Sequence, residues 1–300
     1  MRALVVDHGD DGPVRFEEVP EPQPGPGETL VGIRHIALNF GELKYAAQWP
    51  AGAVHGHDAS GVVVRAAADG SGPAEGSRVV LGLAQHAWAE RVAVDRTRLA
   101  VVPDGVELSD AATIGVAGVT ALRVLRTRSV LAKRVLVTGA SGGVGRFAVQ
   151  LAAIAGARVG ALTGSPAGLR ELGAEEAAAD LDELTGEFDL VVDTVAGPQL
   201  EHVWSRLAPG GDVQLVGAAS GLPTSFPAGA LFAFGAPRTI STFGDVTSSV
   251  SEELADLLAL QAAGRLSAEI GLRTHWQHVD DAVKALLARE VRGKVVLDVS

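Results

Sequence analysis

A glycine-rich turn is the clearest chemical signal in the sequence. Ala140, Gly142 and Gly145 form the pattern A-x-G-x-x-G between an apolar strand at 134–138 and a helix that ends at Gly156. In such a turn the first small residue permits a tight bend, the second lets the backbone approach a phosphate, and the third lets the helix pack on the strand. Unpaired N–H groups and the helix dipole then face the anion. The pattern predicts that a dinucleotide binds here through its pyrophosphate.

The tip of the next strand indicates which dinucleotide binds. Sites for NAD place Asp or Glu about 20 residues beyond the glycines, where the carboxylate accepts from the ribose 2′-OH. Here that place is taken by Thr163, Gly164 and Ser165, and the first acid is Glu171. Hydroxyls and a free backbone N–H can hold a 2′-phosphate that a carboxylate would repel, so NADPH is favoured over NADH. Arg170 is either a ligand of that phosphate or a solvated surface residue.

The composition narrows the class of protein. The chain has 300 residues, of which 47% are hydrophobic, with a formal net charge of −11 and no cysteine. The negative charge argues against a nucleic-acid or anionic-membrane partner, because such binding relies on clustered Lys and Arg. Disulfides and thiolate metal ligands are absent. No apolar run reaches the ~18 residues of a membrane span, and the first residues lack a secretory signal. We therefore expect a soluble cytoplasmic protein with a small-molecule partner.

The expected elements change along the chain and predict an α/β protein with two domains. The first third reads as short strands rich in β-branched residues and separated by Gly, Pro, Asp and Ser. From about Thr120, apolar strands alternate with helices, which is typical of βαβ units and a parallel sheet. Helices are expected in this part at 145–156, 167–173 and 199–211. The closing strand at 293–300 is expected to return to the β-rich domain.

Several motifs, taken in order, resemble the zinc-free quinone oxidoreductase branch of the medium-chain dehydrogenase/reductase (MDR) superfamily, enoyl-reductase relatives included. They are IALNFGELKY, HGHDASGVVV, GSRVVLG, VAGVTAL, VTGASGGVG, DLVVDTVAG, LAPGGDVQLVG and GKVVLDV. The resemblance covers essentially the whole chain. It implies a GroES-like β-rich catalytic domain at residues 1–120 and 246–300, and a Rossmann domain with a doubly wound parallel sheet at residues 121–245. It also implies NADPH as the cofactor and a homodimer.

The resemblance assigns residues to the cofactor, position by position. Those expected to contact NADPH are Thr120 and Asn39 near the nicotinamide, Ser141, Gly142, Gly143 and Val144 at the pyrophosphate, Thr163, Gly164 and Ser165 at the 2′-phosphate, Val195 at the adenosine, and Val216, Gly217 and Ala218 at the carboxamide. Arg289 matches a place where NADPH-using relatives can carry a phosphate-binding Arg, or else it is a solvated cation at the end of a helix. The stretch after Ser165 is shorter than in relatives, where it holds a basic residue.

Departures from the zinc-dependent branch argue against a catalytic metal. Asn39 stands where that branch has a cysteine ligand, and a second cysteine is missing near Gly118. His57 stands at the place of the second zinc ligand, but one His with a nearby acid does not complete a three-ligand site. We therefore expect no metal and expect His57 to be bonded to backbone. A small surface metal site formed by His57 with His55 is the alternative.

Without a Lewis acid, the accessible chemistry is hydride transfer to carbons that are already electrophilic. Quinones and α,β-unsaturated carbonyl compounds qualify, because their conjugated oxygen takes the charge and needs only hydrogen bonds and a proton. Asn39 is the candidate that donates to this oxygen or orients the nicotinamide, and Lys44 and Tyr45 are the candidate proton donors. A solvated lysine, a packed tyrosine ring and a proton from water are the alternatives. Trp49 and Trp88 either face a flat substrate or pack in the core.

These expectations together predict an NADPH-dependent reductase of a quinone or an α,β-unsaturated carbonyl compound. Two alternatives stay open. One is an enoyl-thioester or biosynthetic tailoring reductase. The other is a non-catalytic NADPH-binding protein that acts as a sensor or structural component.

Overall fold

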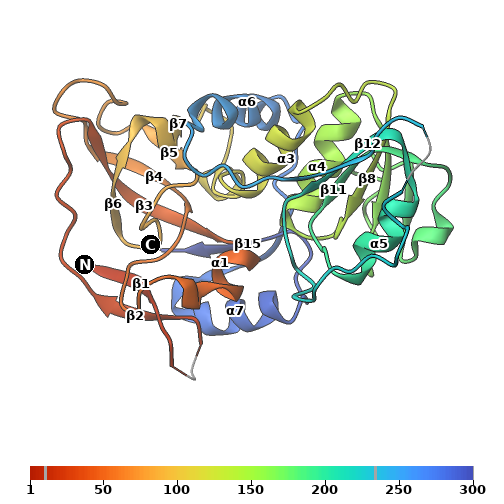
Figure 1. Ribbon diagram of the computed structural model, residues 1–300. Helices are drawn as coiled ribbons and strands as arrows, with labels where there is room; N and C mark the ends of the chain where they lie inside the picture. Colours follow the sequence, from red (N-terminus) through yellow and green to blue (C-terminus); the bar gives the residue numbers. More distant parts are fainter. Residues whose placement is uncertain (10–11, 233–234, 300) are drawn as a thin grey trace. The chain divides into compact units, whose positions relative to one another are not determined.

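The computed structural model describes residues 1–9, 12–232 and 235–299 of the chain. Contacts between Cα atoms divide the chain into two compact units. The first unit combines Met1–Val119 with Val246–Ser300, so both ends of the chain build it, and the second unit is Thr120–Asp245. In Figure 1 the first unit carries the red, orange and blue parts of the chain, and the second unit is mostly green.

The first unit is built on mainly antiparallel β-structure. Its strands are β1 (Arg2–Val6), β2 (Val14–Glu18), β3 (Glu28–Leu38), β4 (Asp58–Arg65), β5 (Arg78–Leu81), β6 (Arg91–Asp95), β7 (Leu99–Val101), β14 (Ile270–His275) and β15 (Lys294–Asp298). β1 pairs with β2, and the larger sheet has the order β14-β15-β3-β4-β5-β7, with β6 beside β3. β15 pairs with β3 antiparallel, which confirms that the closing strand returns to the β-rich domain.

Helices and a tight aromatic core complete this unit. Its helices are α1 (Phe40–Lys44), α2 (Leu108–Ala111), α6 (Ser251–Ala262) and α7 (Val279–Leu287), with the 3₁₀ turns Ala46–Gln48, Arg96–Arg98 and Trp276–His278; α3 (Ala117–Arg126) crosses the boundary between the units. Trp88 is fully buried against Gly56, where a Cβ would lie 2.1 Å from the indole ring. Trp88 is therefore a core residue. Among the described residues, no helix combines the length and the apolar character needed to cross a bilayer.

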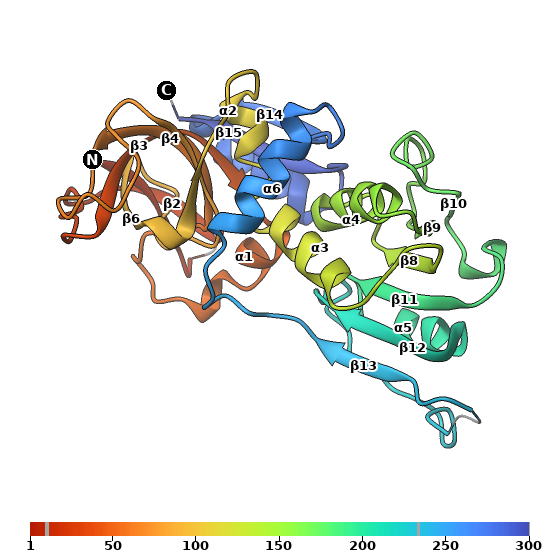
Figure 2. The same ribbon diagram turned by 90° about the horizontal axis from the view of Figure 1, so that it is seen from above.

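The second unit contains the parallel sheet that the sequence predicts. Its strands are β8 (Arg134–Thr138), β9 (Arg158–Leu162), β10 (Glu176–Ala178), β11 (Phe188–Asp193), β12 (Leu207–Leu215) and β13 (Thr239–Thr242), and its helices are α4 (Gly143–Ile154) and α5 (Pro198–Ser205), with a 3₁₀ turn at Leu181–Glu183. Figure 2 shows the strands side by side in the order β10-β9-β8-β11-β12-β13, and each neighbouring pair is parallel. The chain order reverses between β8 and β11. In open α/β sheets, ligands bind beyond the carboxyl ends of the strands at such a reversal.

Two helix predictions differ from the structure. Residues 167–173 form turns instead of a helix. The cause is local, because Gly168 and Gly173 adopt positive φ values of 81° and 105°, outside the right-handed helical region. The helix predicted at 199–211 ends early, since α5 stops at Ser205 and β12 begins at Leu207, which is fully buried and pairs with β11.

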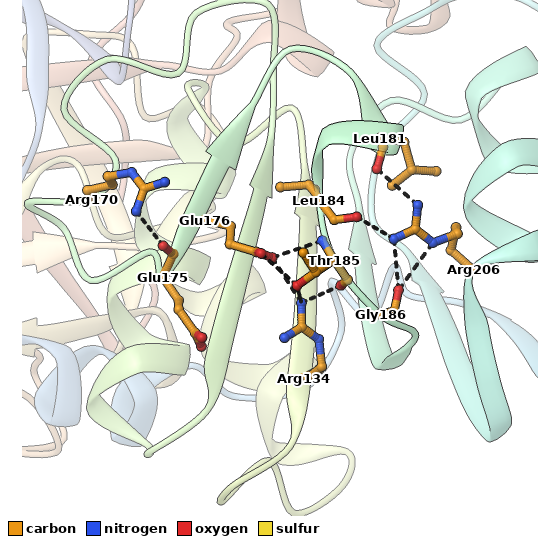
Figure 3. Close-up of polar contacts among 9 residues, drawn as sticks. All are labelled: Arg134, Arg170, Glu175, Glu176, Leu181, Leu184, Thr185, Gly186 and Arg206. Atoms are coloured by element: carbon orange, nitrogen blue, oxygen red, sulfur yellow. Dashed lines mark hydrogen bonds and ion pairs between the residues drawn. The ribbon is translucent and has the colours of Figure 1, made fainter.

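A polar network fastens the loop 181–186 to the sheet, as Figure 3 shows. Arg134 Nη2 lies 2.9 Å from Glu176 Oε2, and Thr185 Oγ1 donates to the other carboxylate oxygen of Glu176 at 2.7 Å. Arg206 donates to the backbone carbonyls of residues 181, 184 and 186 at distances from 2.5 to 3.1 Å. These contacts are internal to the second unit, so their role is to stabilise its fold.

Replacing Arg206 tests this role. Arg206→Met removes several charge-assisted hydrogen bonds, so we expect the free energy of unfolding to fall by about 2 kcal/mol. Arg170→Met is the matched control, because Arg170 is exposed and donates to the Glu175 carbonyl at 2.6 Å, and its loss should cost less than about 0.5 kcal/mol. Urea unfolding of both variants measures the difference. An equal decrease in the free energy of unfolding of the two variants would contradict the stabilising role of Arg206.

Candidate active site

Gly145 lets α4 lie directly against the turn that follows β8. A Cβ on Gly145 would stand 2.4 Å from the carbonyl oxygen of Gly139 and 2.6 Å from Cα of Ala140, distances that no side chain tolerates. Gly139 itself has φ of 58°, in the left-handed region that favours glycine. The glycines at these places therefore serve a close backbone approach, as the sequence pattern predicts.

The start of α4 offers an open place for an anion. Gly142 is the N-cap residue and has no side chain that could cap the helix. Apart from its chain neighbours, a Cβ on Gly142 would have only the Gly139 carbonyl oxygen within 4 Å, at 3.3 Å, so there is room beside Gly142 for an atom of a ligand. The first N–H groups of a helix, here those of Gly143 and Val144, lack acceptors within the helix. The residues present therefore fit the diphosphate of a dinucleotide.

The loop after β9 lies beside this turn. Ser141 Oγ and Thr163 Oγ1 share a hydrogen bond of 2.7 Å, so the structure brings together two of the residues predicted to bind cofactor. Gly164 is exposed, and a Cβ there would meet no atom within 4 Å. The backbone N–H of Ser165 donates to Thr163 Oγ1 at 3.3 Å.

Asp193 holds the loops beyond β8 and β11 together, and sequence reasoning missed it. Its buried carboxylate accepts from the Thr138 hydroxyl and from the backbone N–H of Val195 at 3.1 Å. Its backbone carbonyl accepts from Val216 N–H at 2.9 Å. The neighbouring residues 217 and 218 are exposed at the same edge of the sheet. The signal was present, because Asp193 is the one acid at the carboxyl end of β11.

In the first unit, three strand ends converge on a buried polar cluster. Asn39 follows β3, Asp58 starts β4 and Lys294 starts β15. The register of the strands brings these three residues together, because Asp58 pairs with Ala37 and the residue after Lys294 pairs with Leu38. Asp58 is fully buried and Lys294 is 2% exposed. Sequence reasoning missed Lys294, because only the register of β15 on β3 reveals it.

The hydrogen bonds of Asn39 fix the orientation of its amide. Lys294 Nζ donates to Asn39 Oδ1 at 2.5 Å and to the Leu38 carbonyl at 3.2 Å. Asn39 Nδ2 donates to Glu42 Oε2 at 2.7 Å and to Asp58 Oδ2 at 2.8 Å. An ammonium on one side and two carboxylates on the other permit only this orientation. Both amide protons are thereby engaged within the protein.

Burial and neighbouring charges shift two pKa values in this cluster. Burial raises the pKa of Asp58 to about 7 against the opposing charge of Lys294. Burial alone would lower the pKa of His57, but the hydrogen bond and charge of Glu42 outweigh it and raise the pKa. His57 Nδ1 bonds to the Glu42 carboxylate and not to backbone as expected, whereas His55 Nε2 lies 3.1 Å from the Glu42 carbonyl.

The other predicted residues occupy varied environments. Lys44 is the exposed last residue of α1, and Tyr45 follows it half-buried, with its N–H bonded to the Gly41 carbonyl at 3.1 Å. Arg289 is exposed in the first unit, and its guanidinium lies 5.9 Å from the ring centroid of Phe40. Thr120 is half-buried in α3 and belongs to the second unit.

Comparison with known families identifies the chain. Residues 25–134 match the family described as Alcohol dehydrogenase GroES-like domain, and residues 172–297 match the family described as Zinc-binding dehydrogenase. The chain belongs to the MDR superfamily. The predicted superfamily and fold class are thus confirmed for this MDR protein. The activity as an oxidoreductase stays a prediction. NADPH and the quinone or enone acceptor stay predictions.

Curated relatives of this MDR protein carry several names. Quinone oxidoreductase-like protein 2 of Bos taurus is 27% identical over 314 residues, covering 95% of this chain and 89% of the relative. Acryloyl-coenzyme A reductase of Sulfurisphaera tokodaii is 24% identical over 342 residues, covering 99% of both chains. Erythronolide synthase EryA2 of Saccharopolyspora erythraea is 36% identical over 228 residues, which is 69% of this chain but spans only 6% of the synthase.

Solved structures agree with the MDR fold over the full chain. An NAD-dependent alcohol dehydrogenase is 27% identical with a TM-score of 0.88 and covers 100% of both chains. A mycobacterial protein complexed with NADPH is 26% identical with a TM-score of 0.87 and covers 99% of both chains. The first is named as NAD-dependent and the second is solved with NADPH, so the likeness is compatible with either dinucleotide.

The donor set of this MDR protein does not fit a catalytic zinc ion. In the part of the chain that the structure describes, no three His, Cys, Asp or Glu side chains gather as metal ligands. Asn39 stands where the zinc-dependent branch has a cysteine ligand, and its amide oxygen accepts a hydrogen bond from the Lys294 ammonium. His57 and Glu42 are bonded to each other. No step of the chemistry considered below therefore passes through a metal.

The raised pKa of Asp58 predicts a pH-dependent stability. The folded protein keeps a proton that the unfolded carboxyl, with a pKa of 3.8, releases, so this stabilisation is present below that value and is lost as the pH rises through about 7. Asp58→Asn does not titrate. Its free energy of unfolding, relative to the natural protein, should therefore rise by more than about 1 kcal/mol from about pH 5 to about pH 8.

Urea unfolding at the two pH values measures this effect. Asp104→Asn, at an exposed position, is the control for the general pH dependence. A constant difference between Asp58→Asn and the natural protein at both pH values would show that the pKa of Asp58 is not raised.

Proposed function

We propose that this MDR protein uses NADPH to reduce a quinone or an α,β-unsaturated carbonyl compound without a catalytic metal. The observation that carries the choice of cofactor is the loop after β9, where the hydroxyls of Ser141 and Thr163 meet and no acid stands between residues 163 and 170. A carboxylate there would favour a 2′-OH and repel a 2′-phosphate. A protein of the same fold, 26% identical, is solved with NADPH, so the fold accommodates this dinucleotide.

The polar cluster of the first unit supports the choice of acceptor. When bound, the cofactor supplies the hydride, so the chain's own residues have to position the substrate and provide a proton. Asn39 acts as a positioning residue, because its amide ties the carboxylate of Glu42, which lies on α1, to Asp58 and Lys294. This fixes the helix that carries Lys44. Lys44 Nζ and Tyr45 Oη are the candidate proton donors, with water as the alternative.

An α,β-unsaturated thioester is the second candidate acceptor. It is favoured by the similarity to a relative named acryloyl-coenzyme A reductase and to part of Erythronolide synthase EryA2. The chemistry is the same class, since the thioester carbonyl takes the charge when hydride reaches the β-carbon. The two classes of acceptor differ in the group attached to the conjugated carbonyl. Activity on matched pairs of enones and enoyl thioesters distinguishes them.

The proposal predicts NADPH oxidation by a panel of quinones, enones and enoyl thioesters. Turnover, followed by the loss of NADPH absorbance, should be unchanged after treatment with a chelator, because no metal takes part. Activity confined to thioesters would select the second candidate. A folded protein that binds NADPH and reduces none of these acceptors would contradict the proposed reaction and favour the non-catalytic alternative.

The open turn at α4 predicts that Gly142 and Gly145 respond differently to substitution. Gly142→Val is compatible with the φ of −80°, needs only a small shift of the Gly139 carbonyl, which would lie 3.3 Å from its Cβ, and fills the space expected for the diphosphate. The dissociation constant for NADPH, measured by fluorescence titration, should rise at least about tenfold, while Tm changes by less than about 2 °C. Gly145→Ala should instead lower Tm, because its Cβ meets the backbone at 2.4 Å. Binding by Gly142→Val equal to the natural protein would contradict a diphosphate site at this turn.

A further inference from the structure

We infer that Arg146, on the first turns of α4, is the residue that binds the 2′-phosphate of NADPH and sets the preference over NADH. This inference rests on the proposed function. The inference adds the residue that would bind the phosphate, because the sequence provides no basic residue between Thr163 and Pro166, where the 2′-phosphate is expected. The missing cation comes from the helix on the other side of the turn.

The guanidinium of Arg146 spans the gap between the glycine turn and the loop after β9. Its backbone N–H donates to the Gly142 carbonyl at 3.0 Å, which places the residue at the start of the helix. Its Nε donates to the Ser141 carbonyl at 3.3 Å. On the far side, Nη2 is 3.8 Å from the position of a Cβ on Gly168. The side chain of Arg146 therefore lies between the Ser141 carbonyl and Gly168, which follows Thr163 in the loop after β9.

Burial fixes this positive charge in place. Arg146 is 8% exposed, so its position is held by packing, as a preorganised phosphate site requires. Residues 163–170 of the loop after β9 include the hydroxyls of Thr163 and Ser165 and no Asp or Glu, and Ser141 adds a third hydroxyl from the glycine turn. A phosphate monoester carries nearly two negative charges at neutral pH and pairs well with the planar guanidinium. A bare ribose gains nothing comparable, so the contact discriminates between the two cofactors.

The two other arginines considered for this role have contacts of their own. Arg170 donates to the Glu175 carbonyl, as Figure 3 shows, at the far end of the 166–173 turns. Arg289 belongs to the first unit and lies over the ring of Phe40. Within the second unit, Arg146 is thus the arginine whose side chain lies between the glycine turn and the loop after β9, whereas the side chain of Arg170 is bonded to the end of that loop.

Binding measurements on Arg146→Gln test the inference without relying on turnover. The dissociation constants of NADPH and NADH are measured by fluorescence titration for the natural protein, Arg146→Gln and Arg146→Lys, with Arg170→Met as the matched control. Arg146→Gln should weaken NADPH binding about 10- to 100-fold, the range expected for charge-assisted hydrogen bonds to phosphate, and change NADH binding less than about 3-fold. Arg146→Lys should retain part of the preference, and Arg170→Met all of it.

A second pair of variants covers the case in which Arg146→Gln does not fold. Gly168 is exposed with φ of 81°, a conformation that Asn and Asp adopt more readily than other side chains. Gly168→Asp places a carboxylate beside the guanidinium, whereas Gly168→Asn is its neutral control. We expect Gly168→Asp to bind NADPH at least about tenfold more weakly than Gly168→Asn, with equal NADH binding.

The possible outcomes separate this inference from the proposed function. A natural protein that binds neither dinucleotide overturns both. A natural protein that prefers NADPH, with the preference unchanged in folded Arg146→Gln or equal in the two Gly168 variants, overturns the role of Arg146 alone. Equal loss of NADPH and NADH in Arg146→Gln also overturns it, because the effect is then structural.

Discussion

The close approach of α4 to the turn after β8 is the constraint on which the candidate cofactor site depends. Gly145 permits it, since any side chain there would meet Gly139 and Ala140. With the helix so close, the free N–H groups of its first turn point into the open space above Gly142. The same placement brings Arg146 across to the loop after β9. One backbone contact thereby supports both the diphosphate site and the proposed 2′-phosphate site.

The first unit contains a cluster of buried polar and charged groups. Lys294 faces Asp58 and Asn39, and the carboxylate of Glu42 joins them through the Asn39 amide. Burying these charges is costly unless each is paired. The result is a rigid support for α1, which ends with the candidate proton donor Lys44 and is followed by the other candidate, Tyr45. The cluster itself takes no part in the reaction. The reacting groups are the cofactor, the substrate and a proton donor, which is Lys44, Tyr45 or water.

The fold and the glycine turn could be predicted from sequence because their signals are local. Alternating apolar strands and helices indicate a parallel sheet, and glycines at fixed spacing indicate a phosphate turn. The helix at 167–173 was wrong because glycine backbone conformations override the apolar pattern. Arg146, Glu42 and Lys294 were missed because their contacts arise from helix packing and strand register, which a single sequence does not reveal. The homodimer remains a prediction, since no observation tests it.

The central claim is that a bare backbone turn and one buried arginine together bind NADPH. A crystal structure of the protein with NADP⁺ tests this most directly. We predict that the diphosphate lies over Gly142 and Gly143, and that the 2′-phosphate contacts the Arg146 guanidinium beside Ser165. A diphosphate bound elsewhere, or a 2′-phosphate directed to solvent away from Arg146, would contradict the account.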